Sequence, residues 1–172
     1  MSRLLGAVTV LTCALAGVAP AKDAPSLSLK DLSGAQHSIT EYQGKVVVLN
    51  FWATWCSPCR HELPMLSDLA ARYGYNVMFV AASLDDSTTL AHVPQYLKDA
   101  KITLPVWTGA STSDLDRLHL GIMLPATMVI DTDGTPITRI EGQAREKDIT
   151  SAVDWALQGH SGRRPKALVK RY

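Results

Sequence analysis

Two cysteines stand two residues apart in the segment WCSPCR, residues 55–60, and this spacing permits more than one kind of chemistry. A Cys-x-x-Cys pair can alternate between dithiol and disulfide, supply two thiolates to a metal ion, or close a small structural loop. The residues around Cys56 and Cys59 must decide between a redox pair, a metal site and a structural bridge.

The number of available ligands argues against a metal centre at this pair. A structural zinc site takes four ligands, and the common iron–sulfur clusters take four cysteines. Cys56, Cys59 and His61 would provide three ligands, and the chain has no second cysteine pair. We therefore expect no metal and no other cofactor as the principal partner of these thiols.

A purely structural bridge also explains the pair poorly. A disulfide across two intervening residues closes a very small loop, so it constrains the unfolded chain little. A chain of 172 residues can bury a sizeable core without such a bridge. A working redox pair is the remaining interpretation.

The elements on either side of the cysteines favour the redox interpretation. Residues 46–52 read VVVLNFW, an apolar run typical of a central parallel strand that is buried on both faces. A helical pattern follows the cysteines, with apolar residues at steps of three and four: Leu63, Leu66, Leu69, Ala70 and Tyr73. The pair therefore falls where a buried strand gives way to a helix.

A helix N-terminus suits a reactive thiol because it carries about half a positive charge and free N–H groups. These groups favour the thiolate, which is the nucleophilic form of cysteine. We predict that Cys56 is exposed and acts as the nucleophile, and that Cys59, one turn into the helix, is shielded and resolves the mixed disulfide. Pro58 fits the first helical turn, where its missing N–H costs nothing.

The rest of the chain predicts one α/β domain with a mixed central sheet. An early strand–helix–strand alternation implies a right-handed parallel crossover, and a late hairpin around residues 131–134 implies an antiparallel edge. The expected elements are a hairpin at residues 26–39, strands at 77–84, 105–107, 126–130 and 135–141, and helices at 90–97, 114–120 (capped by Ser113) and 149–156.

The first 21 residues have the pattern of a secretory signal. No charge appears between Arg3 and Lys22, residues 4–18 are apolar or small, and Ala19-Pro20-Ala21 offers a small-residue cleavage site. An uncleaved membrane anchor is the second interpretation, although the apolar run is short for a span of about 20 residues. Any membrane contact would then be made through this segment alone.

Residues 22–158 are expected to form the folded domain, and residues 159–172 a flexible basic tail. The tail holds five basic residues and no acid: Arg163, Arg164, Lys166, Lys170 and Arg171. The whole chain is nearly balanced, with 17 basic and 16 acidic residues, so its charge does not indicate nucleic-acid binding.

The segment VVVLNFWATWCSPCRHELPML resembles the active-site segment of the TlpA/ResA family of extracytoplasmic thiol-disulfide oxidoreductases. The resemblance extends upstream through DLSGAQHSITEYQGK and downstream through LPATMVIDTDG and IEGQ, so it covers about residues 27–157. It implies a thioredoxin-like fold with an N-terminal β-hairpin extension and a helical insertion.

The resemblance also implies functional positions. Cys56 and Cys59 match the redox pair. Pro125 matches a cis proline that faces the disulfide, and the backbone beside it, at Leu124, pairs with the bound substrate. Glu62 matches an acid that lies beside the cysteines and influences their titration.

Three residues of the motif itself complete the expected substrate surface. Trp55 is expected to flank the disulfide as an exposed apolar rim, with Ser57 and Pro58 between the cysteines, whereas Trp52 is expected to pack in the core.

Two positions depart from related patterns. Asn50 stands where thioredoxin has a buried Asp, and an amide cannot accept a proton as that carboxylate can, which moves proton handling toward Glu62. Thr127 stands where members devoted to cytochrome c maturation often carry Glu, so that substrate assignment is in doubt.

Together these features predict a periplasmic thiol-disulfide oxidoreductase that reduces disulfides of partner proteins. The resemblance implies clients in cytochrome c maturation or in copper-site assembly of cytochrome oxidase, and recharging by a membrane-embedded thiol-electron carrier. Three alternatives remain open: a thiol peroxidase of the same fold, a copper-binding chaperone that uses both thiols, and a docking module that has kept the fold without the redox chemistry.

Overall fold

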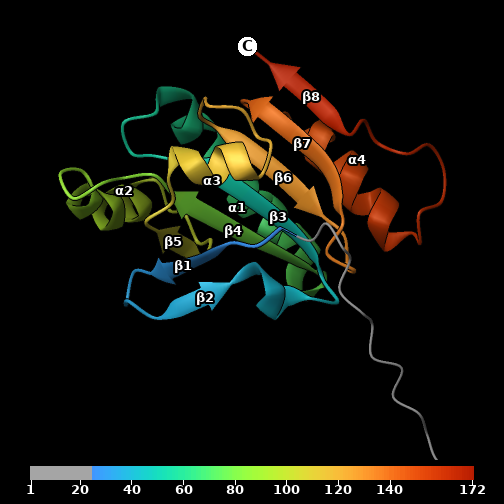
Figure 1. The fold of residues 1–172 in the computed structure, drawn as a ribbon, viewed down its shortest axis with the longest axis horizontal. Coiled ribbons are helices and arrows are strands. Elements are labelled where there is room, and N and C mark those ends of the chain that lie inside the picture. The colour runs from blue at the N-terminus through green and yellow to red at the C-terminus, as the bar shows by residue number, and fades with distance from the viewer. Residues whose placement is uncertain (1–24) are drawn as a thin grey trace, which may run out of the picture.

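A computed structural model describes residues 25–172 (Figure 1), so the predicted signal segment at residues 1–21 lies outside the described part of the chain. The strands form a single eight-stranded sheet in the order β2-β1-β5-β4-β3-β6-β7-β8. The predicted mixed central sheet with flanking helices is therefore confirmed.

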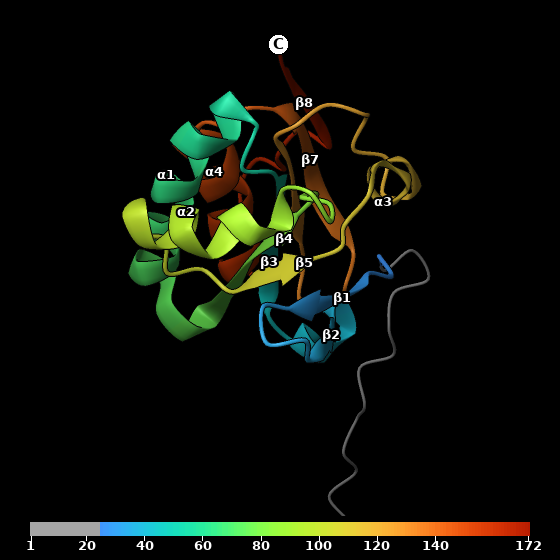
Figure 2. The same cartoon turned by 90° about the vertical axis from the view of Figure 1, so that its left-hand side faces the viewer.

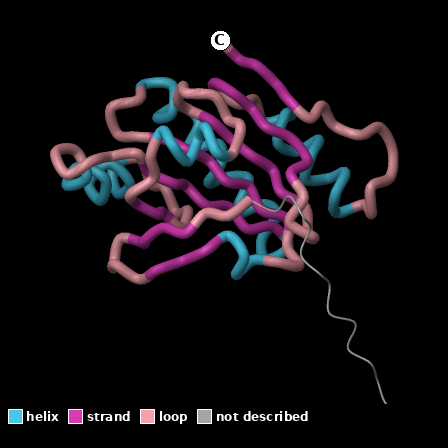
Figure 3. The backbone as a smooth tube through the Cα atoms, viewed as in Figure 1, coloured by secondary structure: helices cyan, strands magenta, loops and turns pink. Residues whose placement is uncertain are grey.

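The elements follow one another along the chain in the predicted order, with a further strand at the end (Figure 3). The strands are β1 (Ser28–Asp31), β2 (Gln36–Ser38), β3 (Val46–Trp52), β4 (Val77–Ser83), β5 (Val106–Thr108), β6 (Ala126–Ile130), β7 (Pro136–Gly142) and β8 (Leu168–Arg171). The α-helices are α1 (Ser57–Tyr73), α2 (Val93–Asp99), α3 (Thr112–Arg117) and α4 (Glu146–Leu157), and short 3-10 helices are η1 (Ile39–Tyr42), η2 (Gly74–Asn76) and η3 (Leu90–His92).

Strand β3 lies at the centre of the sheet and all seven of its residues are buried. It pairs in parallel with β4 and antiparallel with β6, which gives the sheet its mixed character. The predicted crossover from β3 through α1 to β4 is confirmed. An apolar run buried on both faces, as β3 is, requires helices or loops on both sides of the sheet.

Those covers differ between the two faces (Figure 2). Helices α1, α2 and α4 pack on one face, where Val48 contributes to the same apolar cluster as Leu63 and Ile149. Helix α3 and η1 cover the other face, where Leu49 and Leu115 belong to a second cluster. The sheet thus separates two cores, and the cysteines belong to the core beneath α1 and α4.

The predicted hairpin and the predicted helical insertion are both present. Strands β1 and β2 pair antiparallel, and β1 also pairs with β5, so the hairpin extends the main sheet. The insertion consists of η3 and α2, between β4 and β5.

The helix predicted at residues 114–120 begins and ends earlier than expected. Its N-cap is Ser111 and not Ser113, because Asp114 accepts hydrogen bonds from both the N–H and the hydroxyl of Ser111, at 2.9 and 2.7 Å. These hydrogen bonds are part of a capping box, and the helix begins at Thr112. The chain leaves the helical conformation after Leu118, because His119 has a positive φ of 55°.

The prediction of a flexible tail is wrong for the end of the chain. Residues 168–171 form strand β8, which pairs in parallel with the outer edge of β7. The Arg171 guanidinium donates to both carboxylate oxygens of Asp148 in α4, at 2.9 and 2.5 Å. The basic composition gave no sign of this strand, because its stability comes from the unpaired edge of β7 and from Asp148.

Gly142, at the end of β7, permits the close approach of β8. Its φ is +87°, and a Cβ at this position would overlap the carbonyl oxygen of Arg171. Gly44 has nearly the same φ, +91°, but no atom lies within 4 Å of the position of its missing Cβ.

We predict that Gly142→Ala releases β8 from the sheet, whereas Gly44→Ala does not. Both variants carry the strain of a positive φ, about 1 kcal/mol each, but only Gly142→Ala adds a clash with the neighbouring strand. Hydrogen exchange of the amides of residues 168–171 would measure the release. Equal protection of these amides in the two variants would contradict the prediction.

Candidate active site

The two cysteines form a disulfide at the N-terminus of α1, at the end of β3. Their Cα atoms are 5.3 Å apart. Cys56 is the N-cap residue, and its Sγ accepts a hydrogen bond from the Cys59 N–H at 3.3 Å. The first sulfur thus occupies the place that a Ser or Asp oxygen takes in an ordinary helix cap, facing the positive end of the helix dipole.

The loop between β3 and the first cysteine is held by a buried carboxylate, which sequence reasoning missed. Asp85 accepts hydrogen bonds from the N–H and the hydroxyl of Thr54, at 2.9 and 2.5 Å. It also accepts one from the Ser83 hydroxyl at 2.7 Å. The available signal was the position of Asp85 directly after the second buried strand, next to the end of β3 in a parallel pair.

The prediction that Cys56 is exposed needs correction. The residue is only 6% exposed and Cys59 is 0% exposed. The order of accessibility is as predicted, but the disulfide and the packing of Cys56 in the core with Ala53 and Leu63 cover most of its surface.

The rim around the disulfide is apolar and exposed. Trp55 is 61% exposed, as predicted, and Trp52 is buried in the core, also as predicted. Ile122 and Met123, just before the loop proline, are exposed as well. Sequence reasoning treated Met123 as a packing residue, because a single Met more often packs inside the protein, and did not consider Ile122.

The Leu124–Pro125 peptide bond is cis, as the resemblance implied. Ala126 pairs with Phe51 in the β3–β6 ladder, so Pro125 lies at the end of β3 from which the cysteine loop departs. The Pro125 carbonyl accepts a hydrogen bond from the Gly142 N–H at 2.9 Å. The loop is thus fixed to both neighbouring strands at the disulfide end of the sheet.

Helix α1 continues through Pro64 because another group replaces the missing donor. A proline leaves the carbonyl four residues earlier without its helical partner. Here that carbonyl belongs to Arg60, and it accepts a hydrogen bond from the Tyr96 hydroxyl at 3.4 Å. Tyr96 also packs against Trp52, with 5.4 Å between ring centroids, so α2 supports the first turns of α1.

Glu62 is 1% exposed, although it lies only three residues beyond Cys59. Its Oε1 accepts hydrogen bonds from Asn50 Nδ2 at 3.0 Å and from the Thr127 hydroxyl at 2.9 Å. Its Oε2 accepts one from the Ala144 N–H at 3.0 Å. Residues at positions i and i+3 share one face of a helix, so the carboxyl group and the buried cysteine lie on the same side of α1.

Burial raises the pKa of Glu62 from 4.5 to about 7, because the charged form loses its hydration. The hydrogen bonds from Ala144 and Thr127 act in the opposite direction. The result is a carboxyl group that changes charge near neutral pH, beside a pair of cysteines.

Asn50 and Thr127, the two positions that depart from related patterns, meet at this carboxyl group. Asn50 Nδ2 donates to Thr127 Oγ1 at 2.9 Å as well as to Glu62. Within residues 25–172, Asn50 Oδ1 is buried and has no hydrogen-bond partner. The structure thus joins two residues that the sequence singled out separately.

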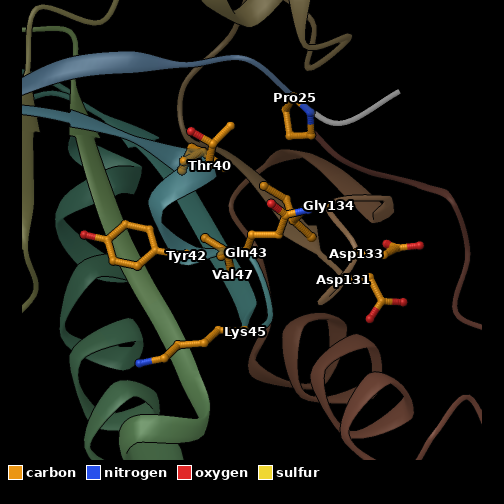
Figure 4. A pocket seen from close by; sticks show the side chains of 11 residues that line it. Pro25, Thr40, Tyr42, Gln43, Lys45, Val47, Asp131, Asp133 and Gly134 are labelled. Carbon is orange, nitrogen blue, oxygen red and sulfur yellow. The ribbon is translucent and has the colours of Figure 1, made fainter. Parts of the chain in front are cut away.

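A small apolar cavity of about 40 Å³ lies away from these residues (Figure 4). Its lining includes Tyr42, Val47 and Ile130. Val47 begins the ladder with β6 and Ile130 ends β6, whereas the disulfide follows the other end of β3. The cavity is therefore separate from the candidate active site.

Neither a metal cluster nor a membrane-spanning helix is found within residues 25–172. This part of the chain holds no group of three or more His, Cys, Asp or Glu side chains arranged to bind a metal ion. None of its helices combines the length and the apolar character of a membrane span.

A disulfide at a helix N-terminus, at the end of a buried strand and next to a cis-proline loop, defines a thioredoxin-fold thiol-disulfide oxidoreductase. The sequence matches the AhpC/TSA family over residues 20–136, and the chain belongs to this family, within it to the TlpA/ResA-like thiol-disulfide oxidoreductases.

Several relatives resemble the chain over most of their length. The thiol-disulfide oxidoreductase ResA of Geobacillus thermodenitrificans is 33% identical over 138 residues, which cover 80% of this chain and 78% of that protein. ResA of Bacillus thuringiensis is 31% identical over 128 residues, covering 74% and 73%. A thioredoxin-family thiol:disulfide interchange protein from Chlorobium tepidum has a similar structure, with a TM-score of 0.66, 28% identity and coverage of 78% and 94%.

A second structure shows the fold alone, because its sequence identity is lower. It is a secreted disulfide oxidoreductase of Mycobacterium tuberculosis, with a TM-score of 0.65, 24% identity and coverage of 78% of this chain and 98% of that protein.

We predict that Glu62→Gln removes part of the pH dependence of stability. The pKa of Glu62 is higher in the folded protein than in the unfolded protein. Between pH 4.5 and about 7 the unfolded protein therefore binds fewer protons than the folded protein. The free energy of unfolding consequently falls as pH rises through this window. By pH 8 this decrease in the free energy of unfolding is about 3 kcal/mol, and we expect it to be absent from the Gln variant. Urea denaturation at pH 5 and pH 8 would measure it.

The control for this prediction is Glu146→Gln, which alters an exposed ion pair with Arg72. His37 also loses a stabilising interaction as pH rises, because Asp31 and Glu41 raise its pKa. The difference between the wild type and each variant cancels the effect of His37. The prediction fails if both variants keep the full pH dependence of the wild type.

Proposed function

We propose that this oxidoreductase works outside the cytoplasm, in the periplasm, and reduces disulfides of partner proteins through Cys56 and Cys59. The observation that carries the proposal is the placement of Cys56 Sγ as the cap of α1, 6% exposed, with Cys59 fully buried behind it. The names of the ResA relatives support the reaction class. The signal-like residues 1–21 support the location.

The reaction proceeds by two exchanges of a sulfur–sulfur bond. The Cys56 thiolate attacks one sulfur of the partner's disulfide, and the partner's other sulfur leaves as a thiolate. The Cys59 thiol then loses its proton, and its thiolate attacks Cys56 Sγ. The partner sulfur that was bonded to Cys56 Sγ leaves as a thiolate, and the Cys56–Cys59 disulfide remains. Two electrons have passed from this protein to its partner.

Glu62 is the group suited to take the proton from Cys59. The two side chains lie on one face of α1, both are excluded from water, and the carboxyl group has a pKa of about 7. The carboxylate accepts the proton before the second exchange and returns it when the pair is reduced again. The other acid of α1, Asp68, is exposed and lies nine residues beyond Cys59 in the sequence.

The apolar rim and the proline loop form the surface that receives the partner. Trp55 offers exposed apolar area beside the disulfide, and Ser57 and Pro58 lie between the two cysteines. In this proposal the backbone at Leu124 and Pro125 pairs with an extended segment of the partner.

The client proteins follow from the resemblance to the TlpA/ResA family. Apocytochrome c and copper-delivery proteins are the proposed clients, although Thr127 binds Glu62 where members devoted to cytochrome c maturation often carry Glu. A membrane-embedded thiol carrier would return the electrons. A reduction potential as oxidising as that of DsbA, about −120 mV, would reverse the proposed direction.

We predict that Cys56→Ser abolishes insulin reduction and that Cys59→Ala accumulates mixed disulfides with partners. Removing the nucleophile prevents the first exchange, whereas removing the resolving thiol stops the reaction after it. Non-reducing electrophoresis of whole-cell extracts would show the trapped complexes, and mass spectrometry would identify the clients.

The same variants separate the alternatives. If neither cysteine variant changes insulin reduction, or if Cys59→Ala traps no protein, the proposal is wrong. Rapid peroxide turnover by Cys59→Ser would favour the peroxidase interpretation. Tight, stoichiometric retention of cuprous copper without insulin reduction would favour the chaperone interpretation.

We predict that Glu62→Gln slows the second exchange and removes its dependence on pH near 7. In the wild type the rate should rise about tenfold from pH 6 to pH 8, because only the carboxylate accepts the Cys59 proton. Stopped-flow measurement of product release from a Cys56 mixed disulfide would report this step. Thr127→Val, which removes one donor to the carboxylate, should move the midpoint to higher pH. An unchanged midpoint in that variant would contradict the role of Glu62.

A further inference from the structure

The basic residues near the C-terminus lie together on one surface of the folded protein. They line a hollow of about 680 Å³ between α4 and the segment that leads into β8. We call this hollow the basic groove. Its cations are Lys147, Arg163, Arg164, Lys166, Lys170 and Arg171.

We propose that the basic groove binds an acidic segment of the partner protein. This inference rests on the proposed function, because it takes the occupant to be part of a disulfide-bearing client. The proposal says that the protein prefers acidic clients. Neither the disulfide nor the apolar rim would select clients by their charge.

The groove has cationic groups that the fold itself does not use. Arg171 is bound to Asp148, the acid in the lining, and Lys170 lies 3.4 Å from Glu141. In contrast, no carboxylate within residues 25–172 lies within 4.0 Å of the charged groups of Lys147, Arg163 or Lys166.

Hydrogen bonds to β7 fix the backbone of the segment that carries Lys166. Thr138 donates a hydrogen bond to the Lys166 carbonyl at 2.6 Å, and the Arg139 N–H donates to the Ala167 carbonyl at 2.9 Å. The Arg164 guanidinium lies over the ring of Trp155, 5.8 Å from its centroid. A segment whose backbone is fixed before binding loses less backbone entropy when it binds than a flexible tail would.

The groove adjoins a second hollow, which is lined in part by a residue that binds Glu62. Lys170 and Arg171 also line a second hollow of about 460 Å³ together with Ala144 and Arg145. The Ala144 N–H is the group that binds Glu62. The two hollows therefore share the side chains at the end of β8.

The shape of the groove favours a polypeptide over a membrane. A bilayer presents a flat anionic surface, which suits cations that project from a protein, whereas these cations line a hollow between a helix and a strand. In the proposed complex an extended acidic segment of the client lies along the hollow, and the client's disulfide lies at Cys56. Opposite charges would also raise the rate of encounter, an effect that salt weakens.

The test compares a groove variant with a control of equal charge change. The groove variant is Lys147→Glu, Arg163→Glu and Lys166→Glu, all at exposed residues. The control is Lys30→Glu, Lys45→Glu and Lys98→Glu, also exposed, in or near β1, β3 and α2 and away from β8. Neither set includes a residue of the candidate active site.

The first probe is a labelled, cysteine-free peptide with four glutamates, compared by fluorescence anisotropy with the same peptide carrying glutamines. We expect the glutamate peptide to bind the wild type at least about tenfold more tightly than the glutamine peptide does. This preference should disappear in the groove variant and remain in the control variant. Salt at about 0.5 M should weaken binding of the glutamate peptide to the wild type. Equal binding of the two peptides, or equal loss in both variants, would overturn the proposal. Groove-dependent binding to phosphatidylglycerol vesicles without binding to the peptide would assign the groove to lipid and also overturn it.

The second probe is reduction of disulfides. We expect kcat/KM for a disulfide peptide flanked by glutamates to fall about tenfold in the groove variant at low salt, and the rate with the neutral hydroxyethyl disulfide to be unchanged. Equal kcat/KM in wild type and groove variant would overturn the proposal. If the wild type fails to reduce hydroxyethyl disulfide, the proposed function fails, while the cysteine-free peptide still tests the groove.

Discussion

The burial of β3 on both faces is the constraint on which the site depends. A strand that is covered by helices on each side cannot shift its register without exposing apolar residues, so its end is fixed in space. The cysteine loop leaves from this end, and Asp85, at the end of the neighbouring strand, holds it through Thr54. The chemistry of Cys56 therefore takes place on a rigid base, and the sulfur meets the N–H groups of α1 in a defined geometry.

The same rigidity explains how a carboxyl group can be kept inside the protein. Burying Glu62 is unfavourable for its charged form, and the three hydrogen bonds come from β3, β6 and the segment after β7. These elements are neighbours in the sheet or follow directly from it. A carboxyl group held from three sides can change its charge with little rearrangement, which suits a group that must exchange protons repeatedly.

The sequence predicted the central part of the fold because its signals are local and strong. Residues 46–52 form an apolar run, the helical period follows at once, and the limits of β6 coincide with the predicted residues 126–130. The resemblance supplied the cis bond before Pro125 and the position of Glu62, neither of which can be deduced from residue spacing. The exposure of Cys56 was overestimated, because packing around a small side chain depends on the whole site.

Features that depend on distant contacts were missed. Strand β8 exists because the edge of β7 is free and Asp148 binds Arg171, and a composition rich in basic residues cannot reveal either partner. The interaction of Asn50 and Thr127 joins residues 77 positions apart. Each residue drew attention by itself as a departure from a pattern, but only the sheet register brings them together.

Strand β8 has a further consequence for the behaviour of the protein in concentrated solution. Without it, the seven-residue strand β7 would present a long row of unpaired backbone groups, which is the kind of surface that promotes aggregation. The added strand has only four residues, and Lys170 and Arg171 bring positive charge to it. At the opposite side the sheet ends with β2, which has three residues. Both borders of the sheet are thus short, so neither offers much length for pairing with another molecule.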